Sequence, residues 1–249
     1  PLPGRAITPT DEIYLNIISD YVADTIILAS KRMIPSSASF GVGQVRGISF
    51  VRNYYMKNST PTTNPGRMNP DIEGPVTDID PDLPVLYIKS ENGNPMGAIV
   101  CFACHQDCVG GTEYSGDYSS SLAKEFKRLY GEDFVTLFMA GTCGNINHFD
   151  VTRADDAPDH YVMMGKILAG EASKVIASGL PVEGDTLKAE FKTIKFDRGY
   201  VDPEKIKNAQ SIIATVKPKE GIKIAADGTD PDQYNLAMSQ RLMDYVNGP

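Results

Sequence analysis

The feature that most constrains the fold of this chain is a hairpin pattern whose second strand ends at a histidine. Two apolar segments, residues 85–89 and 97–103, flank the turn Ser90-Glu91-Asn92-Gly93-Asn94-Pro95. An Asn-Gly pair between two such segments is the strongest short-range signal for a β-hairpin. The second segment continues directly into residues 101–105, which read Cys-Phe-Ala-Cys-His. The sequence therefore predicts a buried strand that delivers His105 at its C-terminal end.

The same five residues also match the C-x-x-C-H attachment signature of a c-type haem. A redox pair is disfavoured because Cys101 and Cys104 are three apart on a strand and face opposite sides. Small buried hydrophobes are the preferred interpretation of both cysteines. Two alternatives stay open at this point: a haem protein, and a structural zinc site formed by the set Cys104, His105, Cys108 and Cys143, which lacks the usual paired spacing.

Strand-like and helix-like periodicities alternate along the rest of the chain, without an internal repeat. We expect helices over about 8–33, 118–130 and 160–177, and two more after Asp202 and Asp230. Strands are expected over 134–139 and 187–196, and a Gly-rich hairpin over 40–50. A Pro-rich loop over 57–82 is expected to border the site. This alternation predicts an α/β fold in which a layered mixed β-sheet is flanked by helices. The expected domain organisation is one domain over residues 1–249, incomplete at both ends.

The composition limits the classes of partner that the chain is expected to bind. The chain has 24 Lys and Arg against 32 Asp and Glu, so its net charge is -8. No basic patch of the kind that binds nucleic acid is visible, so a nucleic-acid partner is not expected. No run approaches the roughly 18 apolar residues that a membrane span requires. A small-molecule or lipid-like substrate is the expected partner, and the start at Pro1, without an initiator Met or a signal segment, suggests a mature or truncated product.

A second strand end carries the same kinds of residue as the first. Residues 134–139 lead into the polar, Gly-rich stretch 141–148, and functional groups gather at such strand ends in α/β sheets. His105, this stretch and Asp117 are predicted to form one site, and the alternative is two loops with Asp117 as a helix cap. His148 either faces the site or lies in solvent. His160, which follows Asp155, Asp156 and Asp159, is expected to open a helix in solvent.

Several of these stretches, in this order, resemble the neutral/alkaline (non-lysosomal) ceramidase family. The stretches that resemble family motifs are Phe40-Gly41-Val42-Gly43, Phe50-Val51-Arg52, Asp80-Pro81-Asp82-Leu83-Pro84-Val85-Leu86, residues 97–105, Ser115-Gly116-Asp117-Tyr118, and residues 138–147. The similarity covers roughly residues 10–180. The ordered set is specific, whereas none of the motifs is specific by itself.

The resemblance implies a zinc-dependent hydrolase that cleaves an N-acyl amide bond, as in ceramide. It implies that His105 is a ligand of the catalytic Zn²⁺ and that Arg52 lies at the site. Zinc activates water and polarises a carbonyl group, and Arg52 or the donors of residues 144–147 are expected to stabilise an oxyanion. The remaining zinc ligands of the family, a His, a Glu and a Tyr, are expected before Pro1 and beyond Pro249. A secreted or periplasmic location is also expected.

The chain departs from the family at the turn 144–148. Asn145 stands where the family has Asp, Asn147 where it has Ser, and His148 where it has Pro. An asparagine amide cannot act as a serine-type nucleophile, although it can donate a hydrogen bond to an oxyanion. A non-catalytic member of the same fold that binds a lipid or a glycan is therefore the alternative function.

Overall fold

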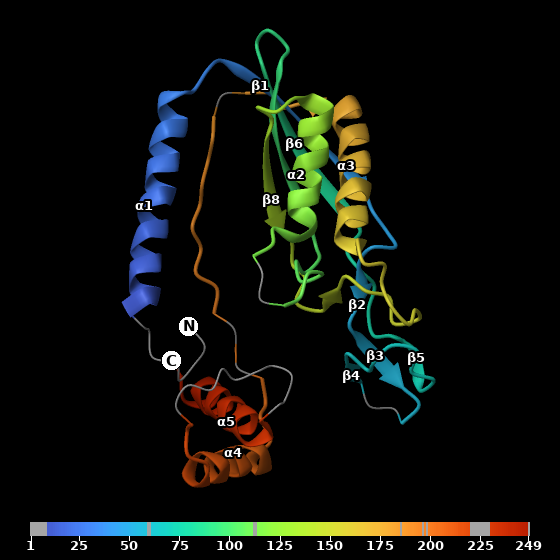
Figure 1. Cartoon of the computed structure of the whole chain (residues 1–249), viewed down its shortest axis with the longest axis vertical. Coiled ribbons are helices and arrows are strands. Elements are labelled where there is room, and N and C mark those ends of the chain that lie inside the picture. Colours follow the sequence, from blue (N-terminus) through green and yellow to red (C-terminus); the bar gives the residue numbers. More distant parts are fainter. Residues whose placement is uncertain are drawn as a thin grey trace. The chain divides into compact units, whose positions relative to one another are not determined.

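The computed structural model describes residues 9–58, 61–111, 114–184, 186–195, 197, 199–219 and 230–248. It confirms a mixed α/β protein with a central sheet and flanking helices (Figure 1). The chain divides into two compact units: Pro1–Met33 with Leu187–Pro249, and Ile34–Thr186. The extent of a single domain over 1–249 stays a prediction.

The larger unit, Ile34–Thr186, is built on a five-stranded sheet in the order β10-β1-β6-β7-β8. Its strands are β10 (Leu180–Pro181), β1 (Ser36–Gln44), β6 (Asp82–Ser90), β7 (Pro95–Phe102) and β8 (Val135–Ala140). Strands β7 and β8 are parallel, and the other neighbours are antiparallel. The β6–β7 hairpin is the predicted one, and its turn is closed by a bond from Gly93 N to Ser90 O of 2.9 Å.

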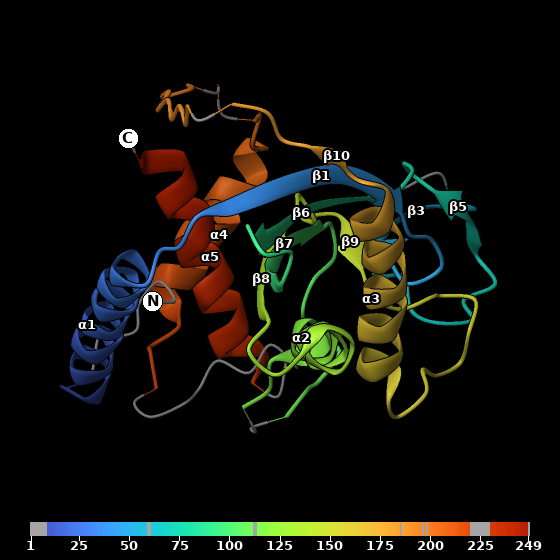
Figure 2. The same cartoon turned by 90° about the horizontal axis from the view of Figure 1, so that it is seen from above.

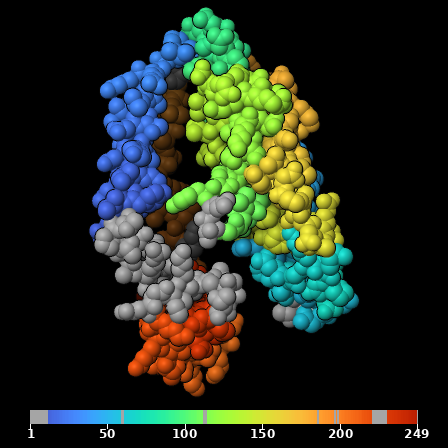
Figure 3. Space-filling model, in the orientation of Figure 1, coloured from blue at the N-terminus to red at the C-terminus, as the bar shows by residue number. Residues whose placement is uncertain are grey.

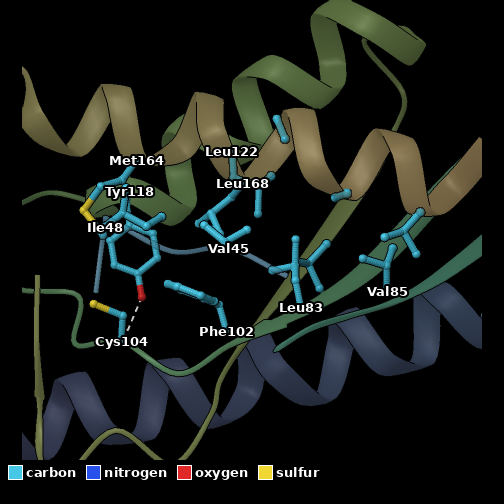
Figure 4. Close-up of a cluster of buried hydrophobic side chains, with 14 of the residues drawn as sticks. Val45, Ile48, Leu83, Val85, Phe102, Cys104, Tyr118, Leu122, Met164 and Leu168 are labelled. Carbon is cyan, nitrogen blue, oxygen red and sulfur yellow. Dashed lines mark hydrogen bonds between the residues drawn. The ribbon is translucent and has the colours of Figure 1, made fainter. Parts of the chain in front are cut away.

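One face of this sheet is covered by two helices, α2 (Asp117–Tyr130) and α3 (His160–Ser178) (Figure 2). The core between helices and sheet consists of apolar side chains that alternate along the strands and recur at helical spacing (Figure 4). The two helices approach closely at Gly165, where a Cβ atom would lie 2.4 Å from Ser121 Cβ and 2.6 Å from Leu122 N. Gly165 therefore permits the close packing of α3 on α2.

The opposite side of β8 carries apolar side chains that the described elements leave exposed. Val135, Leu137 and Met139 are 56–59% exposed, whereas Phe134 is buried. The apolar run over 134–139 indicates a buried strand. The structure corrects this for one face, because α2 and α3 cover only the other face and side chains alternate along a strand.

Two smaller sheets complete the larger unit. Strand β2 (Phe50–Val51) pairs with β9 (Ile146–Asn147), and β3 (Asn53–Met56) lies between β4 (Thr62–Thr63) and β5 (Ile72–Pro75). The prediction of a hairpin over residues 40–50 is wrong. The first half of that segment belongs to β1, which forms its backbone hydrogen bonds with β6 and β10. The segment 57–82 is not one long loop, since its described part contains β4 and β5.

The three-stranded sheet is attached to the segment before α3. Met68 N donates to Val151 O at 2.7 Å, and the Arg67 guanidinium pairs with the Asp156 carboxylate and lies over the Phe149 ring. These two segments lie side by side in Figure 3, where they are coloured cyan and yellow. The connection from β9 to α3 is thereby held at its middle.

The other unit contains α1 (Pro9–Lys31), α4 (Pro203–Thr215) and α5 (Pro231–Asn247). Helices α4 and α5 begin where predicted: the Asp202 carboxylate accepts from Glu204 N, and the Asp230 carboxylate accepts from Gln233 N. The strand expected over 187–196 is wrong, because residues 187–195 have no regular secondary structure. Phe196 lies outside the described residues.

Helix α1 has an exposed apolar surface. Residues 12–31 are all exposed. The stretch Glu12–Lys31 is long and apolar enough to cross a membrane by length and composition, with a mean hydropathy of 1.2. Core helices and signal sequences share these properties, so the stretch does not by itself define a span. The expected absence of a transmembrane segment stays a prediction.

Candidate functional site

The ends of β7 and β8 meet at one edge of the central sheet. The parallel register pairs Phe102 with Ala140, and Gly141 N then donates to Phe102 O at 2.9 Å. A Cβ atom on Gly141 would lie 3.1 Å from Ala103 Cα, so glycine permits this close approach. Just beyond, His105 Nδ1 lies 3.3 Å from Cys143 Sγ. The structure thus brings together the two strand ends that the sequence predicted to share a site.

A second group of predicted residues is joined by the short β2–β9 ladder. Phe50 pairs with Asn147, and Arg52 N donates to Asn145 O at 2.9 Å. Arg52 O in turn accepts from Asn64 N at 2.8 Å. Arg52 therefore lies beside the turn that carries Cys143, and the turn connects this group to His105.

The two asparagines of this turn differ in their surroundings. The Asn147 side chain is buried, at 5% exposed, and its Nδ2 donates to Asn64 Oδ1 at 2.7 Å. The Asn145 side chain is half-buried, and its Nδ2 lies 3.4 Å from Thr77 Oγ1. The Asn147 amide donor is thus used within the fold, whereas Asn145 is held only by a long contact.

Asp117 anchors the loop that carries His105 and Cys108. Its buried carboxylate accepts from Val109 N at 2.9 Å and from Tyr118 N at 2.7 Å. It does so from a left-handed backbone conformation with φ 51°, and short polar side chains tolerate that region best. Both carboxylate oxygens therefore bind backbone. The cap of α2 is Gly116, so Asp117 holds the loop and the first turn from inside the helix and is not the predicted cap.

The cysteines behave as packed thiols. All four are free, and Cys104 is fully buried in the core, where Tyr118 Oη donates to Cys104 O at 2.7 Å (Figure 4). Burial, followed by the charge of Asp107, raises the pKa of the Cys104 thiol to about 12. The interpretation of Cys104 as a small buried hydrophobe is confirmed, and Cys101 is half-buried on β7.

Both remaining histidines are less exposed than their sequence context suggests. The His148 side chain is 12% exposed, and burial lowers its pKa, so His148 does not simply lie in solvent. His160 is half-buried at the start of α3, and its Nε2 lies 2.8 Å from His148 O. The expectation that His160 opens the helix in solvent is therefore wrong, because packing of α3 draws it onto the turn after β9.

The described part of the chain contains one group of at least three His, Cys, Asp or Glu residues with the spacing of a metal site. It consists of Cys108, His148 and His160, whose ligand atoms all lie within 4.8 Å of one another. The proposed zinc set of Cys104, His105, Cys108 and Cys143 is wrong, since only His105 and Cys143 show a close contact. No sequence motif predicts the observed group, because its members come from a loop, a turn and a helix.

A zinc ion at His105 needs more ligands than the described residues supply there. Zinc sites use three or four protein ligands, whereas Cys143 is the potential ligand that lies beside His105. His105 is also not a member of the described group that fits a metal. The residues described here therefore do not by themselves complete the catalytic zinc site that the family resemblance implies.

Comparison with known proteins identifies the fold. No family model and no curated protein matches the sequence. Among solved structures, a neutral ceramidase from Pseudomonas aeruginosa is similar with a TM-score of 0.54 and 23% identity, over 68% of this chain and 27% of that chain. A ceramidase complexed with C2 is similar with a TM-score of 0.50 and 23% identity, over 63% and 25%. The chain spans about a quarter of the length of each. It therefore has a mixed α/β fold similar to part of the neutral ceramidases.

Proposed function

We propose that the protein is a zinc-dependent hydrolase that cleaves an N-acyl amide bond of a lipid-like substrate. The observation that carries this proposal is the position of His105, at the end of β7 and beside Cys143, in a fold similar to part of the neutral ceramidases. Strand ends of this kind are where α/β sheets hold reactive groups. The location proposed with this function is secreted or periplasmic.

His105 is proposed as one zinc ligand, with the other ligands supplied from outside the described residues. Its Nδ1 is engaged with Cys143 Sγ, which leaves Nε2 for an ion. Metal-binding histidines commonly use their second nitrogen in such an orienting hydrogen bond. A zinc ion bound there would polarise the amide carbonyl group and activate water.

Arg52 and Asn145 are the proposed hydrogen-bond donors for the oxyanion. The β2–β9 ladder fixes their backbones next to each other, and a fixed donor costs no reorganisation during the reaction. Asn147 is not proposed as a donor, because its side chain is buried and one N–H of its amide already binds Asn64. Asp117 is proposed to act indirectly, by holding the loop that carries His105.

The test uses the intact protein that contains this chain. Zinc content and turnover of a short-chain fluorescent ceramide and of other N-acyl amides are measured for the wild type and for His105→Ala. We expect loss of turnover and of one zinc ion in the variant, with Gln106→Ala, a change at the exposed neighbouring residue, as control. If neither turnover nor zinc content changed in His105→Ala, the proposal would be wrong.

A non-catalytic role in binding a lipid or a glycan is the second candidate. It is favoured by Asn147, which replaces the family Ser and whose amide is committed to the fold. This candidate predicts saturable binding of ceramide without turnover. Detectable hydrolysis of any N-acyl substrate by the wild type would remove it.

A further inference from the structure

A second group of potential metal ligands lies apart from His105. Cys108 follows β7 in the loop, His148 follows β9, and His160 begins α3. Their ligand atoms lie within 4.8 Å of one another, and all three side chains are at least half-buried. Ligand atoms in a tetrahedral zinc site are separated by ~3.5 Å, so a bound ion would draw this group together by ~1 Å.

A hydrogen bond at His160 and a nearby carboxylate at His148 orient the two imidazoles for such a role. The partner of His160 Nε2 is a carbonyl oxygen, His148 O at 2.8 Å, so Nε2 must be the protonated nitrogen and Nδ1 carries the lone pair. His148 Nε2 lies 3.6 Å from Asp107 Oδ1. A carboxylate or a carbonyl group on the outer nitrogen is the usual environment of a metal-binding histidine.

Nδ1, the other ring nitrogen of His148, gives the strongest support for a role in binding a metal ion. His148 Nδ1 is buried and has no hydrogen-bond partner among the described residues. Leaving a buried polar atom unpaired costs about 1–3 kcal/mol, so such atoms call for an explanation.

Two sulfur atoms extend the group. Cys108 Sγ lies 3.5 Å from Sδ of Met164, which is fully buried in α3 one helical turn after His160. Two sulfurs on one tetrahedral ion with bonds of about 2.3 Å are separated by ~3.8 Å, close to the observed distance. Thiolate, thioether and imidazole together favour zinc or copper(I) over magnesium or calcium.

We propose that Cys108, His148 and His160 bind a thiophilic transition-metal ion, Zn²⁺ or Cu⁺, with Met164 as the fourth ligand. His148 and His160 coordinate through Nδ1. The ion ties the loop after β7, the turn after β9 and the start of α3 to one point, and it does so independently of the zinc proposed at His105. Binding deprotonates the Cys108 thiol, whose proton is released to solvent.

The test begins with the wild-type chain, purified without a histidine tag and made metal-free. It is loaded separately with Zn²⁺ and with Cu⁺ under anaerobic reducing conditions, and the metal retained after desalting is measured. Co²⁺ is used as an optical probe, because a thiolate-to-cobalt band reports ligation by Cys108. We expect one retained ion and a metal-dependent rise in Tm. Retention of neither Zn²⁺ nor Cu⁺ would overturn the proposal.

Single variants then locate the ion. We expect Cys108→Ser and His160→Ala to lose the ion of this group and its cobalt band. Cys101→Ser, a thiol change on β7 outside the group, and His105→Ala, which removes only the zinc ligand proposed above, should retain the ion of this group and the band. An unchanged cobalt band in Cys108→Ser would contradict the site. A result in which only His105→Ala loses zinc would support the proposed function and overturn this inference, so the two fail separately.

A further variant covers the case in which the core variants do not fold. Asp107 is 62% exposed, so Asp107→Asn should leave the fold intact, as circular dichroism can verify. Loss of an orienting partner typically weakens metal binding by about 10- to 100-fold. Unchanged affinity in this variant would overturn coordination through His148 Nδ1.

Discussion

The two histidine groups at this edge of the sheet differ in how the fold holds them. His105 and Cys143 follow two adjacent parallel strands, so their separation is set by the hydrogen-bonded register of β7 and β8. Cys108, His148 and His160 come from a loop, a turn and a helix, so their separation is set by how α3 packs on the sheet. Register is determined by backbone pairing, whereas helix position depends on side-chain volumes. Changes that move α3 should therefore disturb the second group far more than the first.

The largest effect is expected from Gly165→Ala. The added methyl group would lie 2.6 Å from Leu122 N and 2.4 Å from Ser121 Cβ, and a backbone atom cannot move aside without moving α2. We expect the free energy of unfolding to fall by about 2–3 kcal/mol, within the usual range for overpacking. Metal retention at Cys108, His148 and His160 should weaken, because His160 moves with α3.

The matched control for this variant is Gly170→Ala on the same helix. A Cβ atom at Gly170 would meet nothing within 4 Å, and alanine is the better helix former by about 0.5–1 kcal/mol. Urea denaturation of both variants gives the comparison. Equal stability of the two would show that the α2–α3 contact does not limit the position of α3.

Asp117→Asn should have the next largest effect. Asparagine tolerates the left-handed conformation, but its amide has one acceptor oxygen and no charge, so it cannot accept both the bond from Val109 N and the bond from Tyr118 N. Hydrogen bonds to charged groups contribute about 1.5–3 kcal/mol, and we expect about 1–2 kcal/mol to be lost. Both histidine groups should be affected, because one loop carries His105 and Cys108.

Hydrogen exchange at the Val109 amide is the direct measurement for this variant. Exchange should accelerate in Asp117→Asn and remain unchanged in Asp133→Asn, where the substituted carboxylate is exposed. Protection that persists in Asp117→Asn would mean that the loop is held by other contacts.

Gly141→Ala should disturb the first group selectively. Its methyl group would lie 3.1–3.2 Å from the backbone and Cβ of Ala103, so the two strand ends would separate by a few tenths of an ångström. We expect a loss of about 1 kcal/mol, at the lower end of the overpacking range. Cys143 should react faster with a thiol reagent as its contact with His105 weakens.

Gly144→Ala is the control for this change, since a Cβ atom there would meet nothing within 4 Å. Metal retention by the second group should remain unchanged in both variants. If Gly141→Ala removed the metal as well, the two groups would not be independent.

The smallest effect is expected from Lys174→Ala, remote from both groups. Lys174 is 75% exposed and pairs with Glu171, and exposed pairs of this type contribute about 0.2–1 kcal/mol at most. The hydrogen bond from Lys174 holds the pKa of Glu171 below its ordinary value of 4.5. The contribution is therefore present above that value and is lost as the pH falls through the folded-state pKa.

Denaturation at neutral and acid pH tests this reference variant. The difference in the free energy of unfolding between the wild type and Lys174→Ala should be small at neutral pH and vanish on acidification. Metal retention should be the same in both. A large effect on either histidine group would show that the helix surface, and not only its packed side, determines their geometry.

Local signals were sufficient for elements whose determinants are close together in the chain. The Asn-Gly turn predicted the β6–β7 hairpin, and Asp202 and Asp230 predicted the starts of α4 and α5, because a turn or a cap acts within a few residues. Expectations failed where pairing is remote. Residues 40–44 were expected to form a local hairpin, but β1 pairs with β6, about forty residues further along the chain.

The sequence by itself determined that His105 follows a buried strand and that a second polar strand end comes later, because strand periodicity and turn residues are local properties. Only the tertiary structure decided that β7 and β8 are neighbours and that His105 therefore meets Cys143. It alone brought His160 onto His148 and Cys108, since that contact depends on the packing of α3 through Gly165. A pattern along the chain records which residues are available, whereas three-dimensional packing decides which of them share a site.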